Sequence, residues 1–361
     1  MNWPNGLEAA LLRSAPVSDR SGGSLTADLA MLKDAGFHTA PLPVVQGGQG
    51  WACDPGRLET LFAALRMLGR ANLSVGRIFE GHLNALKLIE LYGSDAQMRD
   101  VSAKVAQGCW LGVWGAEGRN PVTFDAGMLQ GSKQFASGID DIGAAIVPVG
   151  SGSKCQLYLA PCDDSIRGDA SSWKVSGMRA TRSGIYDFSG VAAQPLGPPG
   201  DYQREPYFEG GVWRYCAVHL GGAEALRDEA MAAIARRKQQ DAPRQRERIA
   251  TMATLCETMR LWVWEAASRV EYGSGEQTRA AKDGRSAAAY ALLARERTEL
   301  ACLEVMTIAD RAMGTAGHAE GCPADRVRRD LGLFLRQADI DGKLDRATQA
   351  VIDANGKADE M

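Results

Sequence analysis

The sequence lacks the segments that would insert it into a membrane or export it. No run of 18 apolar residues occurs, so a transmembrane helix is not expected. The opening MNWPNGLEAALLRSAP lacks the basic-then-apolar order of a signal peptide. The net charge of −3 and the pI of about 5.9 provide no positive field for nucleic acid or anionic lipid. We therefore expect a cytoplasmic protein that binds neither nucleic acid nor membrane.

The sequence also lacks the residue pairs that bind the common metals. Its eight cysteines are scattered without a CxxC pair, and no two of its four histidines are within helical reach of each other. A zinc or iron site of the usual His and Cys types is therefore not expected. Most of the cysteines have apolar neighbours, which favours reduced, buried thiols over disulfides.

Three zones of different character make up the chain. Residues 1–108 carry leucines at helical spacing, such as Leu25, Leu29 and Leu32, and predict an N-terminal helical domain. Residues 109–205 alternate short apolar runs with Gly, Ser, Asp and Pro clusters, which indicates a small β-domain closed by the linker PLGPPGDYQREP. Residues 206–361 return to long helices rich in Ala, Leu and Arg, and four or five antiparallel helices fit this length.

Several motifs, in this order, resemble the acyl-CoA dehydrogenase family over nearly the whole chain. LPVVQGGQGW and LYGSDAQMRDVSAKVAQG look like its early glycine-rich loop and the helical segment after it. LQGSKQFASGID and GMRATRSGIYDFSGV are similar to its Gly-x-Lys strand and its Gly-Met-Arg-x-Thr strand pair. Its C-terminal glycine, proline and arginine–aspartate signature is matched by Gly314, Gly317, Pro323, Arg326, Arg329 and Asp330.

The resemblance implies a fold, a cofactor and an assembly. The fold would be mainly α with a central β-domain: an N-terminal helical domain, a small β-barrel-like domain and a C-terminal four-helix bundle. The cofactor would be FAD, and the chain would be a flavoprotein oxidoreductase acting on a small molecule such as an acyl-CoA. Subunits would pair as a homodimer or homotetramer so that each flavin site is shared.

By the same resemblance, five residues of the β-domain would contact the flavin. The segment GVWGAEG would pass the flavin and contributes Trp114, Ala116 and Glu117. Phe135 and Ser137 would supply the aromatic wall and the hydroxyl that a flavin ring uses. Ala116 replaces the family's threonine, which removes one side-chain hydrogen bond. The alternative is that WLGVWG is simply a core strand.

Three further residues would complete the flavin site from the helical zone. Arg237 matches the arginine that reaches the phosphates of the neighbouring subunit's FAD, and Gly314 and Gly317 belong to the C-terminal signature. Gln240 and Asp241 replace the Phe-Gly that usually follows this arginine, and an aspartate near a pyrophosphate is unfavourable unless it points away. Loss of the cofactor is therefore an open alternative.

The family's catalytic glutamate is missing. Dehydrogenation of an acyl thioester requires a carboxylate within reach of the α-proton, in a dry pocket that raises its pKa. The usual position, eight residues after the Arg-Asp pair, is Ala338. Some members carry the glutamate directly before an arginine on an earlier helix; here that arginine is Arg214 and the residue before it is Trp213.

Three residues are candidates for a displaced base. Asp341 lies three residues after the usual position and is followed by glycine, as the family's glutamate is. Glu209 precedes Arg214 by five residues, and His318 stands where the family often has an aromatic residue near the flavin. The alternative is that all three are surface or structural groups.

Three functions remain open at this stage. The first is an FAD-dependent acyl-CoA dehydrogenase with a displaced or absent base. The second is a monooxygenase of the same fold, which uses reduced flavin and O₂ and lacks the glutamate. The third is a flavin-free relative that binds a ligand or a partner. The motifs favour the first.

Overall fold

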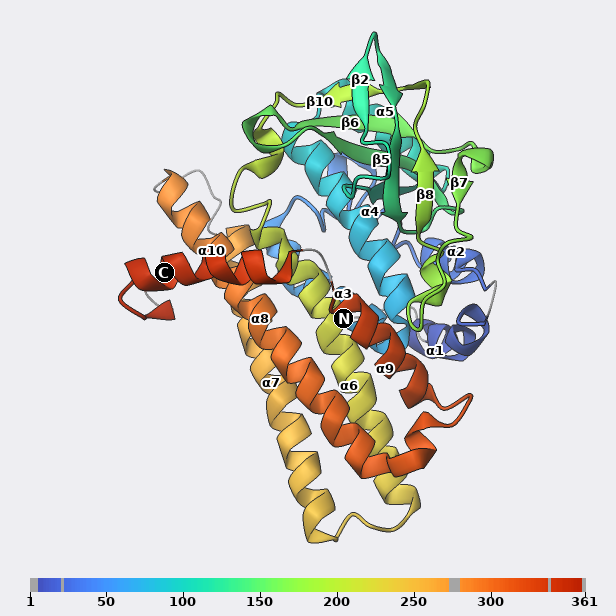
Figure 1. Cartoon of the computed structure of the whole chain (residues 1–361), viewed down its shortest axis with the longest axis vertical. Coiled ribbons are helices and arrows are strands. Elements are labelled where there is room, and N and C mark those ends of the chain that lie inside the picture. Colours follow the sequence, from blue (N-terminus) through green and yellow to red (C-terminus); the bar gives the residue numbers. More distant parts are fainter. Residues whose placement is uncertain (1–5, 21–22, 273–279, 337–338, 359–361) are drawn as a thin grey trace.

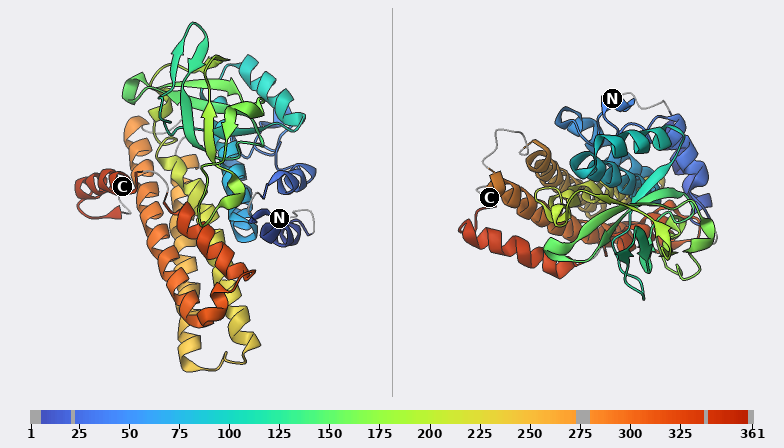
Figure 2. Two further views of the ribbon diagram at one scale, coloured as in Figure 1. Left: turned by 45° about the vertical axis from the view of Figure 1, so that its right-hand side comes forward. Right: turned by 90° about the horizontal axis from the view of Figure 1, so that it is seen from above.

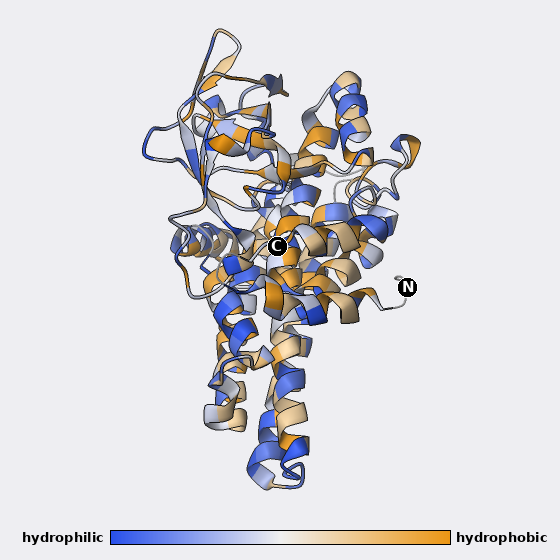
Figure 3. Cartoon of the chain, turned by 90° about the vertical axis from the view of Figure 1, so that its right-hand side faces the viewer, coloured by the Kyte–Doolittle hydropathy of each residue, from blue (hydrophilic) through white to orange (hydrophobic). Residues whose placement is uncertain are grey.

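The computed structural model describes residues 6–20, 23–272, 280–336 and 339–358. Figure 1 shows a β region at one end, helices packed beside it, and a long helical bundle that extends away from it. The views in Figure 2 show the same arrangement from two other directions. A continuous hydrophobic core of buried side chains joins all three parts. Figure 3 shows hydrophilic residues at the free end of the bundle.

The N-terminal part is helical, as its leucine spacing predicts. The helices are α1 (Leu7–Ser18), α2 (Thr26–Asp34), α3 (Leu58–Ala71), α4 (Leu73–Tyr92) and α5 (Asp95–Ala106). Leu25, Leu29 and Leu32 are all buried. Helix α5 begins with a capping box in which Ser94 and Gln97 each satisfy the other's backbone N–H.

The central part is β-structure in three small sheets. The strands are β1 (Trp110–Val113), β2 (Thr123–Asp125), β3 (Met128–Gln130), β4 (Ser132–Ala136), β5 (Ile142–Val149), β6 (Gln156–Pro161), β7 (Gly168–Asp169), β8 (Gly184–Asp187), β9 (Val191–Ala192) and β10 (Gln194–Leu196). The sheets have the orders β1-β5-β6-β10, β2-β3-β9 and β4-β8-β7, and β1 runs parallel to β5. The described strands form no closed barrel, so the expected barrel-like closure is wrong. Many of the strands are only two or three residues long, too short to pair around a ring.

The C-terminal part is a helical bundle with one additional helix. It contains α6 (Trp213–Arg236), α7 (Pro243–Tyr272), α8 (Ala280–Met313), α9 (Pro323–Phe334) and α10 (Ile340–Asp353). One face of α7 is buried along Met252, Cys256, Met259 and Val263. The mainly α fold with a central β region and a C-terminal bundle is therefore confirmed. None of the helices that the structure describes combines the length and the apolarity needed to cross a bilayer.

Helix α3 packs on α6 at a point where two glycines allow the backbones to approach closely. A Cβ on Gly69 would lie 2.1 Å from the carbonyl oxygen of Val218, and a Cβ on Gly221 would lie 2.1 Å from that of Arg66. The same contact contains an ion pair, in which the half-exposed Arg66 donates from Nε to the buried Glu224 over 2.7 Å. The N-terminal helices therefore form one packed unit with the bundle.

Helix α9 is attached to the β region through the arginine–aspartate signature. Asp330 is buried and accepts the backbone N–H of Met178 over 2.5 Å. Arg329 donates to the carbonyl of Ser176 over 2.6 Å and forms an ion pair with Asp19 after α1. Two motifs that are far apart in the sequence are therefore in direct contact, and their role in this structure is to hold three parts of the fold together.

Candidate functional site

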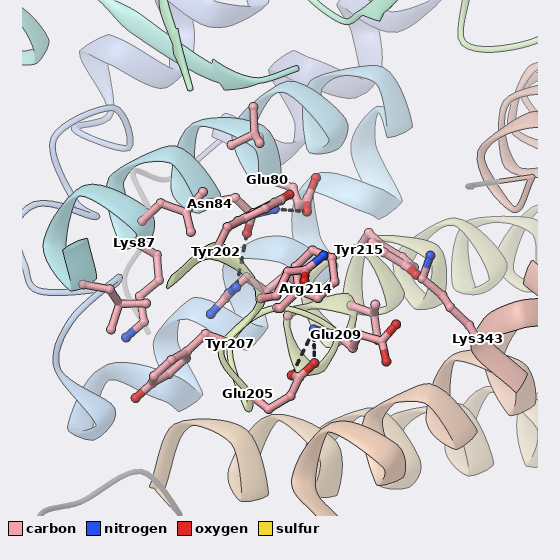
Figure 4. A pocket seen from close by; sticks show the side chains of 18 of the residues that line it. Glu80, Asn84, Lys87, Tyr202, Glu205, Tyr207, Glu209, Arg214, Tyr215 and Lys343 are labelled. Carbon is pink, nitrogen blue, oxygen red and sulfur yellow. Dashed lines mark hydrogen bonds between the residues drawn. The ribbon is translucent and has the colours of Figure 1, made fainter. Parts of the chain in front are cut away.

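A cavity of about 700 Å³ lies between α4, residues 202–212, the start of α6 and α10 (Figure 4). Val113, the last residue of β1, lines it on the side of the β region. Its aromatic lining residues are Tyr202, Tyr207, Phe208 and Tyr215. Its charged lining residues are Arg77, Glu80, Lys87, Glu205, Glu209, Arg214, Asp339, Lys343 and Arg346. A concave, partly aromatic site with converging polar groups is typical of small-molecule binding.

Arg214, one of the predicted catalytic residues, is fixed in the cavity wall. Its guanidinium donates to Glu271 over 2.6 Å and to Asn84 over 3.3 Å. The indole of Trp213 donates to Glu271 over 3.2 Å, and Lys87 Nζ lies 3.5 Å from the other oxygen of that carboxylate. Burial raises the pKa of Glu271, but the charges of Arg214 and Lys87 outweigh it and hold the pKa below its usual range. The positive charge of Arg214 is therefore already paired with the negative charge of Glu271.

Glu209, a predicted base, also lies in the cavity wall. Its side chain is 15% exposed and accepts a hydrogen bond from Arg346 Nε over 2.7 Å. Arg346 belongs to α10 and also bonds Asp339 over 3.0 Å. The carboxylate of Glu209 is therefore engaged by the helix that covers this side of the cavity.

Sequence reasoning missed Glu205, a second carboxylate in the same segment. Glu205 accepts the backbone N–H groups of Glu209 over 3.1 Å and Gly210 over 3.5 Å. Burial, helped by the charge of Glu209, raises the pKa of Glu205 to about 7. Glu205 was overlooked because it lies in a stretch that resembles a linker. The available signal was a carboxylate at a junction between domains, where binding cavities often form.

The other two predicted bases lie outside the cavity. Asp341 is exposed in the first turn of α10, where its charge suits the helix dipole. His318 lines a separate hollow of about 640 Å³, and its Nε2 lies 3.4 Å from the Asp310 carboxylate. Ala338, at the usual position of the glutamate, lies outside the described residues.

Three of the predicted flavin residues form an exposed shelf beside strand β4. The carbonyl of Ala116 accepts the N–H of Gln134 over 2.9 Å, so this segment runs along β4. Phe135 lies at an irregularity of the strand, with φ of 55°, and is 60% exposed. The hydroxyl of Ser137 is 3.0 Å from that of Ser183. Phe135 thus presents an exposed ring and Ser137 a hydroxyl, and their contact with a flavin stays a prediction.

The other two predicted flavin residues of the β region, Trp114 and Glu117, bond neighbouring residues of the β region. Trp114 is buried and donates its indole N–H to the carbonyl of Ser137 over 3.2 Å. Glu117 pairs with the buried ammonium of Lys133 and accepts the N–H of Val122 over 3.0 Å. Both side chains therefore have structural partners within the β region.

A cleft rich in cations lies next to the shelf. Trp173, whose ring centroid is 6.4 Å from that of Phe135, lines a hollow of about 540 Å³. No carboxylate is among the described residues that line it. We call this hollow the basic cleft, and its cations are Arg20, Lys174, Arg179 and Arg182.

Comparison with known proteins identifies the fold. Residues 207–334 match the family model "Acyl-CoA dehydrogenase, C-terminal domain". The FMN-bound TdsC of Paenibacillus superposes with a TM-score of 0.83 at 19% identity, covering 96% of each chain. The chain therefore has the acyl-CoA dehydrogenase-like fold, and its C-terminal part resembles the C-terminal domain of that family. Methanesulfinate monooxygenase MsuC of Pseudomonas fluorescens has the same fold, with a TM-score of 0.80 at 21% identity over 96% of this chain and 95% of that one.

The curated relatives of this acyl-CoA dehydrogenase-type chain include monooxygenases. Dibenzothiophene monooxygenase of Rhodococcus erythropolis is 30% identical over 230 residues, which cover 55% of this chain and 51% of the relative. The chain thus spans about half the length of the curated relatives it matches.

The remaining three predicted flavin residues lie far from the shelf in this acyl-CoA dehydrogenase-like fold. Arg237 follows α6 and donates to the carbonyls of Ala312 (3.3 Å) and Met313 (2.6 Å), which end α8. Gly314 ends that helix with φ of 62°, and Gly317 is buried in the 3₁₀ turn after it. Figure 1 shows this end of the bundle opposite the β region. A single chain therefore does not bring the two groups together.

Proposed function

We propose that this chain is a reduced-flavin-dependent monooxygenase whose small-molecule substrate binds in the cavity. The similarity over 230 residues to dibenzothiophene monooxygenase carries the proposal. The two positions where acyl-CoA dehydrogenases carry the catalytic glutamate agree with the proposal, because they hold Trp213 and Ala338, and neither side chain is a base. The indole of Trp213 bonds Glu271 and cannot accept a proton from a substrate. This proposal replaces acyl-CoA dehydrogenation, the function that the motifs favour.

The residues of the shelf and the basic cleft fit a flavin. Phe135 offers an exposed ring, Ser137 a hydroxyl, and the basic cleft positive charge for a phosphate. We propose FMN, because its single phosphate suits the cations that lie beside the shelf. FMN is also the flavin in the solved TdsC structure. When bound and reduced, the flavin would supply the electrons that activate O₂.

The chain's own residues would then position the substrate and exclude water. Arg214 and Glu271 form a fixed ion pair at one wall, and Arg346 of α10 holds Glu209 at the other. Val113 places the cavity at the end of β1, directly before the segment that forms the shelf. A preorganised polar pocket of this kind holds a substrate without reorganising during the reaction.

The test is a set of optical and oxygen measurements on the purified protein. We expect binding of FMN in preference to FAD, substrate-dependent consumption of O₂ when a reductase supplies reduced flavin, and no anaerobic bleaching of the bound flavin by acyl-CoA. Bleaching by an acyl-CoA would instead establish the dehydrogenase. No uptake of either flavin would leave only the flavin-free relative.

A pair of variants tests the location of the phosphate. Lys174→Ala with Arg179→Ala should weaken FMN binding by about ten-fold or more, because two charges near the phosphate are lost. Arg57→Ala, an exposed arginine directly before α3, is the matched control and should leave FMN binding unchanged. Equal affinity in both variants would show that the basic cleft does not hold the phosphate.

A further inference from the structure

We propose that the cavity binds a substrate that carries a protonated amine, with the carboxylate of Glu205 as its counter-ion. This inference rests on the proposed function only in taking the cavity as the substrate site. It adds the chemical class of the substrate and the residue that recognises it.

The first step is the state of the other carboxylates in the cavity. Glu80 accepts hydrogen bonds from Arg77 and Asn84. Glu209 and Asp339 are both bonded by Arg346. Every other carboxylate of the described lining is therefore already paired with a cation.

Glu205 differs from these carboxylates. Among the described residues, no cationic nitrogen lies within 4.0 Å of its oxygens, and its hydrogen bonds come from the backbone N–H groups of Glu209 and Gly210. Among the described residues, the charged groups that act on it are Glu209 in its own segment and Arg346 on α10. Gly284 of α8 lies against the backbone carbonyl of Glu205. Ionising a half-buried carboxylate without a paired cation is unfavourable, so a ligand that brings a cation is favoured.

The cations of the cavity point to the same conclusion. Lys87 and Arg214 share Glu271, and Arg77 and Arg346 have the partners given above. The negative charges of Asp339 and Glu209 stabilise the positive charge of Lys343. An anionic substrate would have to compete with these existing pairs, whereas an ammonium group would meet an available carboxylate.

The aromatic part of the lining suits a cation as well. Tyr202, Tyr207 and Phe208 belong to the same segment as Glu205, and Figure 4 shows Tyr202, Tyr207 and Glu205 among the residues that line the cavity. The face of Tyr207 already lies 4.9 Å from the ammonium of Lys87. A carboxylate beside aromatic faces is a common way of binding an amine.

The same contact would prepare the amine for oxygenation. With a pKa of about 7, Glu205 exchanges protons readily near neutral pH. The proton of R–NH₃⁺ moves to the carboxylate, which leaves R–NH₂ and a neutral carboxylic acid. The nitrogen would then have a free electron pair to form an N–O bond as the O–O bond breaks. With O₂ as the source of oxygen and reduced flavin as the two-electron donor, the products would be R–NHOH, water and oxidised flavin.

Equilibrium binding to the flavin-free protein tests this inference. The probes are benzylamine, its neutral isostere benzyl alcohol, and benzoate, titrated calorimetrically at about pH 8, where Glu205 is ionised. We expect benzylamine to bind at least about ten-fold more tightly than either of the others. Glu205→Gln should remove this preference while leaving the affinity for benzyl alcohol unchanged, because Gln keeps an acceptor for the backbone N–H groups.

The pH dependence gives a second readout. Benzylamine should bind more tightly as pH rises through about 7, the pKa of Glu205, and this rise should be absent in Glu205→Gln. Glu320→Gln, a carboxylate change in the separate hollow, is the matched control and should behave as the parent does.

Three results would overturn the inference. They are no measurable binding of benzylamine, equal binding of amine and alcohol, or full amine preference in Glu205→Gln. Because no flavin is present, none of these results depends on whether the chain is a monooxygenase. Conversely, failure of the flavin measurements would leave the amine preference intact.

Discussion

His82 shows how single residues position the site. It is buried on α4, where its Nδ1 accepts the backbone N–H of Leu111 over 3.0 Å. Its Nε2 must then carry the proton and donate to the carbonyl of His38, 2.8 Å away. Only the neutral ring makes both bonds, so this tautomer attaches strand β1 to α4. It thereby also fixes the start of the segment after β1 that forms the shelf.

Acid should therefore destabilise the folded protein by protonating His82. Burial lowers the pKa of His82 from 6.5 to about 4, so the folded state binds this proton less readily than the unfolded state does. The stabilisation is complete above pH 6.5 and is lost as the pH falls from 6.5 towards 4. His82→Ala should lower the free energy of unfolding at neutral pH by about 1–3 kcal/mol, because it leaves the N–H of Leu111 unsatisfied.

Urea denaturation over this pH range measures both effects. His82→Ala should show a shallower loss of stability on acidification than the parent. His318→Ala removes a half-exposed histidine at another site and should retain the parent's pH dependence. Identical pH profiles for His82→Ala and the parent would exclude His82 as the acid-sensitive group.

Single residues also show where the sequence was informative. The arginine–aspartate signature was found by resemblance, and Asp330 shows its physical role by holding Met178 of the β region. Glu205 was not found, because nothing in its local sequence distinguishes it from a linker carboxylate. Its environment comes from Glu209, α8 and α10, and only the folded chain brings these together.

At the scale of elements, α10 decides how closed the cavity is. It packs against α8 and lines the cavity with Asp339, Lys343 and Arg346. Arg346 is its link to the opposite wall through Glu209. The sequence predicted Asp341 as the important residue of this helix, but helical periodicity gives a register only where one face is known to be buried. In the structure Asp341 lies on the exposed face.

Arg346→Ala should release α10 without unfolding the protein. The arginine is 46% exposed, and surface ion pairs contribute only about 1 kcal/mol or less, so global stability should change by no more than that. Hydrogen exchange of the α10 amides should become several-fold faster, because the helix loses its contact with residues 202–212. Gln349→Ala, at an exposed position of the same helix, is the control, and equal exchange in both variants would show that Arg346 does not hold the helix.

The strands illustrate a second limit of the sequence at this scale. Alternating apolar runs predicted a β region, and the boundaries of β5 and β6 follow those runs closely. The pairing of β1 with β5 in parallel, and the division into three small sheets, depend on contacts between distant segments. Local patterns do not specify which distant strands pair, and the barrel-like shape was expected only from the family resemblance.

At the scale of the whole molecule, the predicted flavin residues fall into two separated groups. Phe135 and Ser137 lie on the shelf of the β region, whereas Arg237, Gly314 and Gly317 lie at the free end of the bundle. Two copies arranged so that the bundle end of one meets the shelf of the other would unite the groups. Leu261 of α7 and Leu300 and Leu303 of α8 are exposed apolar residues of the bundle, and we propose that they lie in the interface of such a pair.

We therefore expect the chain to be at least a dimer and flavin binding to require the dimer. Leu300→Glu with Leu303→Glu places two charges on this apolar surface and should yield a monomer in light scattering, because burying unpaired charge in an interface is unfavourable. The monomer should keep its circular dichroism spectrum but bind FMN at least about ten-fold more weakly, since the partner's Arg237 region is lost. Val45→Glu, at an exposed apolar residue outside the bundle, is the control and should remain dimeric. A monomer that binds FMN as tightly as the parent would show that one chain forms the whole flavin site.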